Sequence, residues 1–449
     1  MVFLEAVRGA SCNLPSAVCR LRPAVAFCLL AVALAAACGE ERPASTTLVL
    51  SYGRMTAEHD SVLLELATRF EAGHPGVRVQ LHPLQPGSDS QRFFYLRSFT
   101  AGSQLIDVFE LDNIWTAELA AAGTLRTPQE PPYARGLSAA VRQAASYRGR
   151  VEALPSFVAT SLLYYRTDLL EKHAIAVPTS LTELAETARR IADEEGVDGY
   201  LWQGAEYEGL TCVFLEVYQG MGGRVRLLER GIFLEGEVVR RALAWLFDLV
   251  ESGASPHAVT GLGEPGGRER FLAGDAAFLR DWDDFLASAR GQDGPIAANV
   301  GVAVLPGLAG RPGVSTLGGW HLGVNASTQN PGPAAELVDF LTSDESQRVL
   351  TERLGRLPAS SGVPRAPVWQ GAAGGVLDKA LALAAPRPSS PYYHDLSRII
   401  QEEVHAALVS DKSVDAAADK LVERVRALTL SPEAGPEFPR MLLNPSFLF

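Results

Sequence analysis

Short apolar runs alternate with stretches of helical periodicity along the first part of the chain. The run Thr47–Tyr52 is predicted to be a strand, and Ser61–Ala72 has apolar residues at helical spacing, which predicts an amphipathic helix. His74-Pro75-Gly76 would end that helix, and Val77–Leu81 then alternates between apolar and polar residues. Strand, helix and strand at this length predict a βαβ unit, and therefore a parallel sheet covered by helices.

The same alternation continues to the end of the chain. Further strands are predicted at 106–111, 161–166, 276–280 and 300–306. Further helices are predicted at 91–102, near 115–119, and at 168–173, 181–194, 237–250, 334–341, 343–350, 396–408 and 414–428. Strands that alternate with helices predict the α/β class. The 449 residues suffice for two or three domains.

Leu317-Gly318-Gly319-Trp320 is predicted to form a corner between the strand at 300–306 and a second one at 321–325. Glycine lets a backbone approach a ligand closely, and tryptophan offers a flat apolar face with one polar group. The corner could therefore form the floor of a sugar site. The alternative is a tight turn beside a core tryptophan.

The first 38 residues have the pattern of an export signal. Arg8, Arg20 and Arg22 precede an apolar segment at 24–34, and Ala35-Ala36-Ala37 then leads to Cys38. This segment is too short to be a stable membrane span. Small residues directly before a cysteine resemble a bacterial lipobox, so we expect 1–37 to be a signal peptide, Cys38 to be lipidated, and 38–47 to be a tether. Plain cleavage without lipidation is the alternative, and the natural start codon could lie downstream of Met1.

Cysteine content and charge narrow the class of protein. Four of the five cysteines lie in the first 38 residues, so cleavage before Cys38 would leave Cys212 as the remaining thiol after it, with no disulfide within the fold. No later apolar run reaches about 20 residues, the length of a membrane-spanning helix. The net charge of −12 argues against nucleic acid as the main partner, because phosphate binding needs a basic surface.

Asp112 follows the apolar run 106–111 directly. In open α/β sheets, ligands bind beyond the carboxyl ends of the strands, which makes Asp112 a candidate binding residue. The alternative is that Asp112 serves as the N-cap of the helix that begins near Trp115.

Several short segments, taken together, resemble one family. They are Asp112–Glu118 (DNIWTAE), Leu163–Lys172 (LYYRTDLLEK), Tyr207–Leu210 (YEGL), Phe271–Phe278 with Trp282 downstream, Leu317–Trp320 (LGGW) and Arg387-Pro388. They occur in the family's order between about residues 48 and 430. The family is that of the extracytoplasmic solute-binding proteins of ABC sugar importers, and the similarity is greatest to its trehalose/maltose-binding branch.

The resemblance implies a two-lobed α/β fold of the periplasmic-binding-protein kind, type II and maltose-binding-like, with a ligand cleft and a hinge between the lobes. Lobe 1 would comprise 48–153 and 313–358, and lobe 2 would comprise 154–312 and 359–449. The lobes would close on the sugar by hinge motion, and the closed form would dock on the importer's permease subunits. The protein would be a monomer, without a cofactor or metal, anchored through Cys38 in the periplasm or at the outer face of the cytoplasmic membrane.

The resemblance also implies roles for individual residues. Trp320 and Trp282 would stack on sugar rings, and Gly319 would let the backbone approach the ligand. The groups that would bind sugar hydroxyls are those of Glu58, Arg92, Asp112, Tyr207 and Arg387, since charged groups make strong hydrogen bonds to hydroxyls. Each has a structural alternative: Trp282 could be core, Arg387 a solvated charge in a proline-rich loop, and Tyr207, like its neighbour Glu208, a helix cap.

Two departures from the family pattern bear on specificity. Where the family often has an aromatic residue and an aspartate before the LYYR segment, this chain has Ser156 and Ala159. After Trp282 the family often has Pro-Tyr, and here Asp283-Asp284 follows. The loss of a ring and the gain of a carboxylate should change which sugar fits, so trehalose is not assigned. Another disaccharide, an amino sugar and a phosphorylated sugar are the alternatives, and an acidic cleft disfavours the phosphate.

An enzyme and a sensing module are the two alternatives to a transport-linked binding protein. A glycosidase needs two carboxylates at a set separation, and two acidic clusters, Asp107/Glu110/Asp112 and Asp281/Asp283/Asp284, contain such residues. The chain has no G-x-S-x-G elbow, P-loop or H-E-x-x-H pair, and the second cluster lacks the twelve-residue spacing of a calcium loop. A sugar-sensing module that is not coupled to transport is the third class. The sequence favours a binding protein that performs no chemistry on its ligand.

Overall fold

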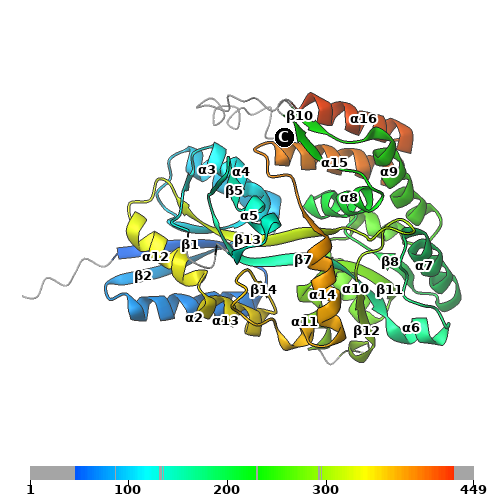
Figure 1. Ribbon diagram of the computed structural model, residues 1–449, viewed down its shortest axis with the longest axis horizontal. Helices are drawn as coiled ribbons and strands as arrows, with labels where there is room; N and C mark the ends of the chain where they lie inside the picture. The colour runs from blue at the N-terminus through cyan, green and yellow to red at the C-terminus, as the bar shows by residue number, and fades with distance from the viewer. Residues whose placement is uncertain are drawn as a thin grey trace, which may run out of the picture. The chain divides into compact units, whose positions relative to one another are not determined.

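The computed structural model describes residues 46–85, 87–130, 134, 136–228, 231–291, 294 and 296–428 (Figure 1). From Thr47 onward the chain belongs to one compact unit. The predicted signal peptide, Cys38 and nearly all of the predicted tether lie outside the described residues, as does the end of predicted lobe 2 from residue 429. The lobe boundaries stay a prediction.

A mixed sheet runs through this unit. Its main strands, in spatial order, are β2 (Val77–Leu84), β1 (Thr46–Gly53), β3 (Val108–Asp112), β13 (Ser315–Asn325), β7 (Leu154–Arg166), β11 (Ala276–Trp282) and β8 (Asp198–Leu201). β1 and β3 pair in parallel, as do β11 and β8, whereas β13 pairs antiparallel with both β3 and β7. Figure 1 shows the long strands β7 and β13 side by side in the middle of the sheet. The parallel pairing predicted for the first strands is therefore confined to parts of the sheet.

Shorter strands extend or flank the sheet. β12 (Val300–Ala303) and β14 (Leu357–Pro358) pair with β7, and β4 (Leu125–Arg126) and β15 (Ala384–Pro386) pair with β13. Two small hairpins are formed by β5 (Ser146–Tyr147) with β6 (Arg150–Val151) and by β9 (Arg226–Leu228) with β10 (Gly231–Phe233).

Helices connect these strands and cover the sheet (Figure 1). They are α2 (Ala57–Gly73), α3 (Ser88–Thr100), α4 (Thr116–Ala121), α5 (Ala139–Ala144), α6 (Thr167–Lys172), α7 (Leu181–Glu195), α8 (Glu208–Gly220), α9 (Gly236–Glu251), α10 (Glu264–Ala273), α11 (Asp284–Arg290), α12 (Pro331–Leu341), α13 (Asp344–Leu354), α14 (Ala372–Leu383), α15 (Tyr393–Leu408) and α16 (Val414–Ala427). Short 3₁₀ turns lie at η1 (Asn113–Trp115), η3 (His257–Gly261), η4 (Ala297–Asn299) and η5 (Pro367–Trp369).

Local sequence explains several helix boundaries. Ser180 caps α7 through a capping box, in which its hydroxyl accepts from the Glu183 amide and the Glu183 carboxylate accepts from the Ser180 amide. The helix predicted at 181–194 is thus confirmed. The apolar stripe predicted at 61–72 is also confirmed, because α2 buries Val62, Leu66 and Phe70 in one core cluster with strand residues of β1 and β3.

The corner predicted at Leu317–Trp320 is wrong. These residues lie inside β13, a continuous strand of 11 residues, and the chain does not turn there. The strand is irregular instead: Gly319 has φ +123°, and the register with β7 shifts between Trp320 and His321. Pairing with β7 at the two glycines, with β15 before them and with β3 after them holds the backbone extended, so the two glycines serve the irregularity and not a turn.

Candidate ligand-binding site

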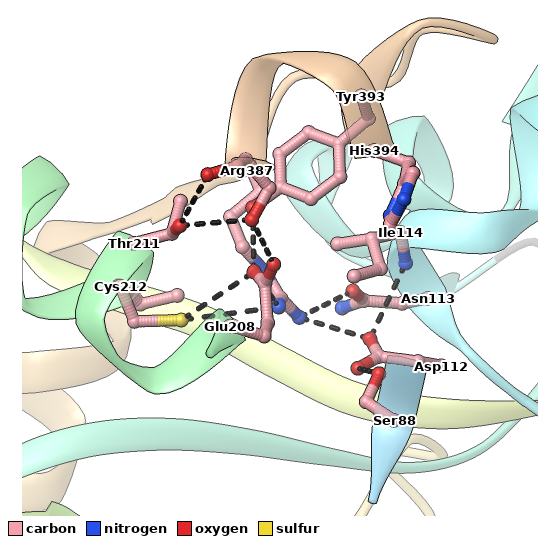
Figure 2. Close-up of polar contacts among 12 residues, drawn as sticks. Ser88, Asp112, Asn113, Ile114, Glu208, Thr211, Cys212, Arg387, Tyr393 and His394 are labelled. Atoms are coloured by element: carbon pink, nitrogen blue, oxygen red, sulfur yellow. Dashed lines mark hydrogen bonds and ion pairs between the residues drawn. The ribbon is translucent and has the colours of Figure 1, made fainter. Parts of the chain in front are cut away.

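The centre of the candidate site is a buried network around Arg387, directly after β15 (Figure 2). Its guanidinium donates to Asp112 at 3.0 Å, to the side-chain oxygen of Asn113 at 2.8 Å, and to Glu208 at 2.8 Å. Asp112 ends β3, and Glu208 begins α8. The network therefore joins three segments that are far apart in sequence, and Arg387 is buried and paired, not a solvated loop charge.

Glu208 has further partners that hold its carboxylate in place. Tyr393 and Ser397 on α15 each donate a hydroxyl to it at 2.6 Å. Burial raises the pKa of Glu208 above its ordinary value, and Arg387 partly offsets this. Burial also opposes the charge on Arg387, but the neighbouring carboxylates outweigh it and keep the pKa of Arg387 well above its usual range.

Asp112 is the N-cap of η1, the structural alternative for this residue, and it also belongs to the Arg387 network. One carboxylate oxygen accepts weakly from the Ile114 amide at 3.4 Å, as the N-cap of η1, and also accepts from Arg387. The other oxygen accepts from the Ser88 hydroxyl at 3.1 Å, at the start of α3 (Figure 2). Asp112 thus ties the amino-terminal end of α3 to the Arg387 network.

The two candidate stacking residues lie beside the glycines of β13. Trp320 is opposite Asp112 in the β13–β3 register and meets Trp115 edge-on, with the ring centroids 5.5 Å apart. The Trp282 ring lies against Gly318, where an added Cβ would come within 2.9 Å of it. Both tryptophans are only partly buried, so neither is a fully enclosed core residue.

Tyr207 and Trp282 are linked through Glu264, the first residue of α10. The Tyr207 hydroxyl donates to the Glu264 carboxylate at 2.6 Å, and the Trp282 indole N–H donates to the same carboxylate at 3.2 Å. Burial and the Glu264 charge raise the pKa of Tyr207, so its hydroxyl stays protonated. Trp282 also faces the Arg280 guanidinium, 4.5 Å from its ring centroid. The contacts with Glu264 and Arg280 therefore fix the orientation of the Trp282 ring.

Glu58 and Arg92 have partners of their own. Glu58 lies exposed on α2 and accepts from Arg353 at 2.7 Å. Arg92 lies buried on α3 and makes a two-pronged ion pair with Glu118, with one donor–acceptor distance of 2.6 Å. The structure brings Asp112, Arg387, Gly319 and Trp320 together and links Tyr207 to Trp282. It gives Glu58 and Arg92 no direct contact with that group.

Ser156 and Ala159, which depart from the family pattern, both lie on β7. Ser156 is buried and lines a small space with Glu110 and Leu50, whereas its neighbour Phe157 pairs with Trp320 across the β7–β13 ladder. An aromatic ring is therefore present one residue beyond Ser156. Ala159 lies opposite Gly318 and has no carboxylate, so the chain lacks the carboxylate that the family often has at this position.

The acidic residues at the end of β11 and directly after it are all engaged by protein partners. Asp281 makes a two-pronged ion pair with Arg268 at 2.8 and 2.9 Å, and Asp284 contacts both Arg268 and Arg356. Asp283 is buried and accepts from the Thr160 amide at 2.7 Å, and burial raises its pKa to about 8. Among the described residues, no three His, Cys, Asp or Glu side chains are arranged to hold a metal ion.

Two carboxylates of the site were not predicted from the sequence. The sequence indicates Glu208 only as a possible helix cap, and it gives no indication of Glu264. The YEGL segment could have indicated Glu208, because a carboxylate at the start of a helix faces the strand ends in this class of fold. No sequence motif indicates Glu264, since only the packing of α10 against β11 brings its carboxylate to Trp282.

The known proteins similar to this chain are solute-binding proteins. Residues 56–348 match the profile of the bacterial extracellular solute-binding proteins. A probable ABC transporter-binding protein of Deinococcus radiodurans is 35% identical over 282 residues, which cover 61% of this chain and 67% of the relative. Maltose-bound MalE3 of T. maritima is 31% identical, with a TM-score of 0.77 over 85% of this chain and 100% of that one. The GacH receptor of Streptomyces glaucescens is 24% identical, with a TM-score of 0.74 over 85% of this chain and 98% of that one.

The chain belongs to the bacterial extracellular solute-binding protein family, since the match covers more than half of its length. Its fold is the two-lobed, maltose-binding-like α/β fold. It is a binding protein and not an enzyme, as the family and the relatives indicate. Within the part of the chain that the structure describes, no helix combines the length and apolar character needed to cross a bilayer.

Proposed function

We propose that this protein binds an oligosaccharide, a disaccharide such as maltose or trehalose, and delivers it to an ABC importer. The observation that carries the proposal is the meeting of a partly buried tryptophan with a charged network across neighbouring strands: Trp320 of β13 lies opposite Asp112 of β3, which is bonded to Arg387. Sugars present apolar C–H faces and hydroxyls in fixed directions. Aromatic faces suit the former, and charge-assisted hydrogen bonds suit the latter.

Each candidate residue has a role in this proposal. Trp320 and Trp282 stack on the sugar rings, and Gly319 lets the β13 backbone come close to one of them. Asp112 and Arg387 bind hydroxyls at the centre, and Tyr207 adds its hydroxyl beside Trp282. Glu58 and Arg92 would contribute only if ligand binding broke their present ion pairs, which makes them the weakest members of the set.

The similarity to maltose-bound MalE3 supports a disaccharide of this size, and the Deinococcus relative supports coupling to an ABC transporter. The lobes predicted at 48–153 with 313–358, and at 154–312 with 359–449, would close around the sugar. The protein would work as a monomer outside the cytoplasmic membrane, held by a lipid on Cys38, and would dock on the importer's permease subunits.

Isothermal titration of the chain from Gly39 onward against trehalose, maltose, sucrose and their monosaccharides tests the proposal. We expect a dissociation constant in the micromolar range or tighter for one disaccharide, lost in both Trp320→Ala and Asp112→Ala. Trp245→Phe is the matched control, because Trp245 lies on α9 and contacts none of the candidate residues in the described network. Binding that survives Trp320→Ala would show that the sugar lies elsewhere.

Coupling to transport needs a separate test. Deletion of the gene should abolish uptake of the sugar identified by titration, and a copy with Trp320→Ala should not restore it. Normal uptake in the deletion strain, despite tight binding in vitro, would favour a sensing module that is not coupled to import.

A further inference from the structure

Glu264 connects two parts of the candidate site that belong to different elements. It is the first residue of α10, and its carboxylate accepts from the Tyr207 hydroxyl at 2.6 Å and from the Trp282 indole N–H at 3.2 Å. Tyr207 directly precedes α8, and Trp282 is the last residue of β11. Glu208, which follows Tyr207, pairs with Arg387. Glu264 therefore links the end of β11 to the segment that carries the Arg387 network.

The two donors that meet at Glu264 suit a carboxylate. The indole N–H of a tryptophan can only donate a hydrogen bond, and a phenol has a single proton to donate. Each oxygen of the Glu264 carboxylate accepts one of these two protons. Hydrogen bonds to a charged acceptor are stronger than those between neutral groups, and the start of a helix favours negative charge. Because its proton goes to Glu264, the Tyr207 oxygen has only lone pairs left for a further partner.

The hydrogen bond to Glu264 decides how the Trp282 ring is turned. The torsion that turns an aromatic ring has broad minima, so packing by itself sets the ring angle loosely. Gly318 lies against the six-membered part of the ring, where an added Cβ would come within 2.9 Å of Cζ3. The Arg280 guanidinium lies over the ring, 4.5 Å from its centroid. Glu264 holds the nitrogen-bearing edge, and a turned ring would lose this bond.

Close packing brings the Tyr207 hydroxyl to the same carboxylate. An added Cβ at Gly209 would lie 2.3 Å from the Tyr207 hydroxyl oxygen, and one at Gly263 would lie 3.4 Å from it. A side chain at Gly209 would therefore displace the phenol. The position of Tyr207 thus depends on this space in the first turn of α8 and on the carboxylate that receives its proton.

We propose that Glu264 is a positioning residue of the candidate sugar site: its carboxylate fixes the Trp282 ring and the Tyr207 hydroxyl before the ligand arrives. The inference rests on the function proposed above, and it gives a role to a residue that no sequence motif indicates. Groups that are ordered in advance lose less conformational entropy when a ligand binds. Removal of the carboxylate should therefore lower the affinity even though both aromatic side chains remain.

Two variants separate the hydrogen bonds of Glu264 from its charge. Glu264→Met removes both acceptor oxygens and nearly keeps the length of the side chain. Glu264→Gln keeps an oxygen for the Trp282 N–H, and its amide can donate to the Tyr207 oxygen, so both contacts can persist without the charge. Glu269→Met, at an exposed position on the same helix, is the matched control.

The indole N–H signal of Trp282 in the NMR spectrum of the ligand-free protein reports the contact with Glu264 directly. Trp282→Phe identifies this signal among those of the six tryptophans. Glu264→Met should move the signal and weaken binding of the disaccharide found by titration by roughly tenfold. Glu264→Gln should move it less and keep the affinity within about threefold of the wild type. Glu269→Met should change neither quantity.

Three results would overturn the positioning role. One is an indole signal that Glu264→Met leaves in place, and another is a moved signal with the affinity of the wild type. The third is an equal loss of affinity in Glu264→Gln and Glu264→Met, which would assign the effect to the charge. A wild-type protein that binds no sugar of the panel refutes the proposed function instead, and the indole signal then still shows whether Glu264 fixes the ring.

Discussion

The Arg387 guanidinium donates to the Asp112 carboxylate at 3.0 Å, although 275 positions separate the two residues along the chain. On its other side the same guanidinium contacts Glu208, so one buried cation holds two buried carboxylates. In the lobe division predicted from the sequence, Asp112 belongs to lobe 1 and Glu208 to lobe 2. Arg387 would then bridge the lobes as well as bind sugar.

Removal of Arg387 should therefore destabilise the protein and not only weaken binding. Arg387→Met leaves Asp112 and Glu208 buried without their cation, and a broken buried pair typically costs about 3–5 kcal/mol. Urea denaturation followed by circular dichroism measures the free energy of unfolding. Arg365→Met is the control: its pair with Asp378 is largely exposed, so the change should stay within about 1 kcal/mol. Equal effects of the two variants would contradict the buried network.

Gly319 is predicted to tolerate no side chain. Its φ of +123° is unfavourable for other residues, and an added Cβ would lie 2.8 Å from Val158 Cα and closer still to the Phe157 carbonyl oxygen. Gly319→Ala should cost more than about 1 kcal/mol of unfolding free energy, because strain and overlap both act.

Gly332→Ala is the matched control for that variant. Gly332 lies in the first turn of α12, and an added Cβ there would meet nothing within 4 Å. Alanine favours a helix over glycine, so this variant should be neutral or gain up to about 1 kcal/mol. Thermal melting of both variants distinguishes the two effects, and a Gly319→Ala protein as stable as wild type would show that β13 is regular in solution.

The raised pKa of Asp283 should make the stability of the folded protein depend on pH. Burial, with the Asp284 charge, raises its pKa from an ordinary 3.8 to about 8 in the folded protein. The folded state then holds a proton that the unfolded state releases, so this stabilising contribution is full below about pH 4 and is lost as the pH rises through 8. Asp283→Asn keeps an oxygen for the Thr160 amide and cannot ionise.

Asp283→Asn should match the wild type near pH 4 and exceed it increasingly toward pH 8, by about 1 kcal/mol per pH unit. Urea denaturation at four pH values between these limits measures the difference. A difference that does not change with pH would mean that Asp283 titrates at its ordinary value in the folded protein.

Cys38 is predicted to hold the protein at the membrane. Expression of the full chain in a bacterial host should give a membrane-associated form whose amino-terminal cysteine bears acyl chains, and Cys38→Ala should release the protein to the soluble fraction. Mass spectrometry of the detergent-extracted protein identifies the modification. A membrane fraction with unmodified Cys38 would reject lipidation and leave plain cleavage.

The local elements and the residue types of the candidate site could be predicted from the order of amino acids. Contacts between residues a few positions apart set helix caps and apolar stripes, so α7 with its Ser180 cap and α2 with its buried face follow from the sequence. The family motifs also indicated Trp320, Asp112 and Arg387 as candidates, without showing that the last two touch.

Which of these residues meet depends on how distant segments pack, and this could not be predicted from local sequence. Gly318-Gly319 lies within a strand because both glycines pair with β7, while β15 pairs with the residues before them and β3 with those after them, and no local signal shows those partners. Likewise, Glu264 reaches Tyr207 and Trp282 only because α10 packs on β11. The contacts of Arg387 with Asp112 and Glu208 depend on the order of strands in the sheet. That order is set by burial and pairing across the whole chain and not by neighbouring residues.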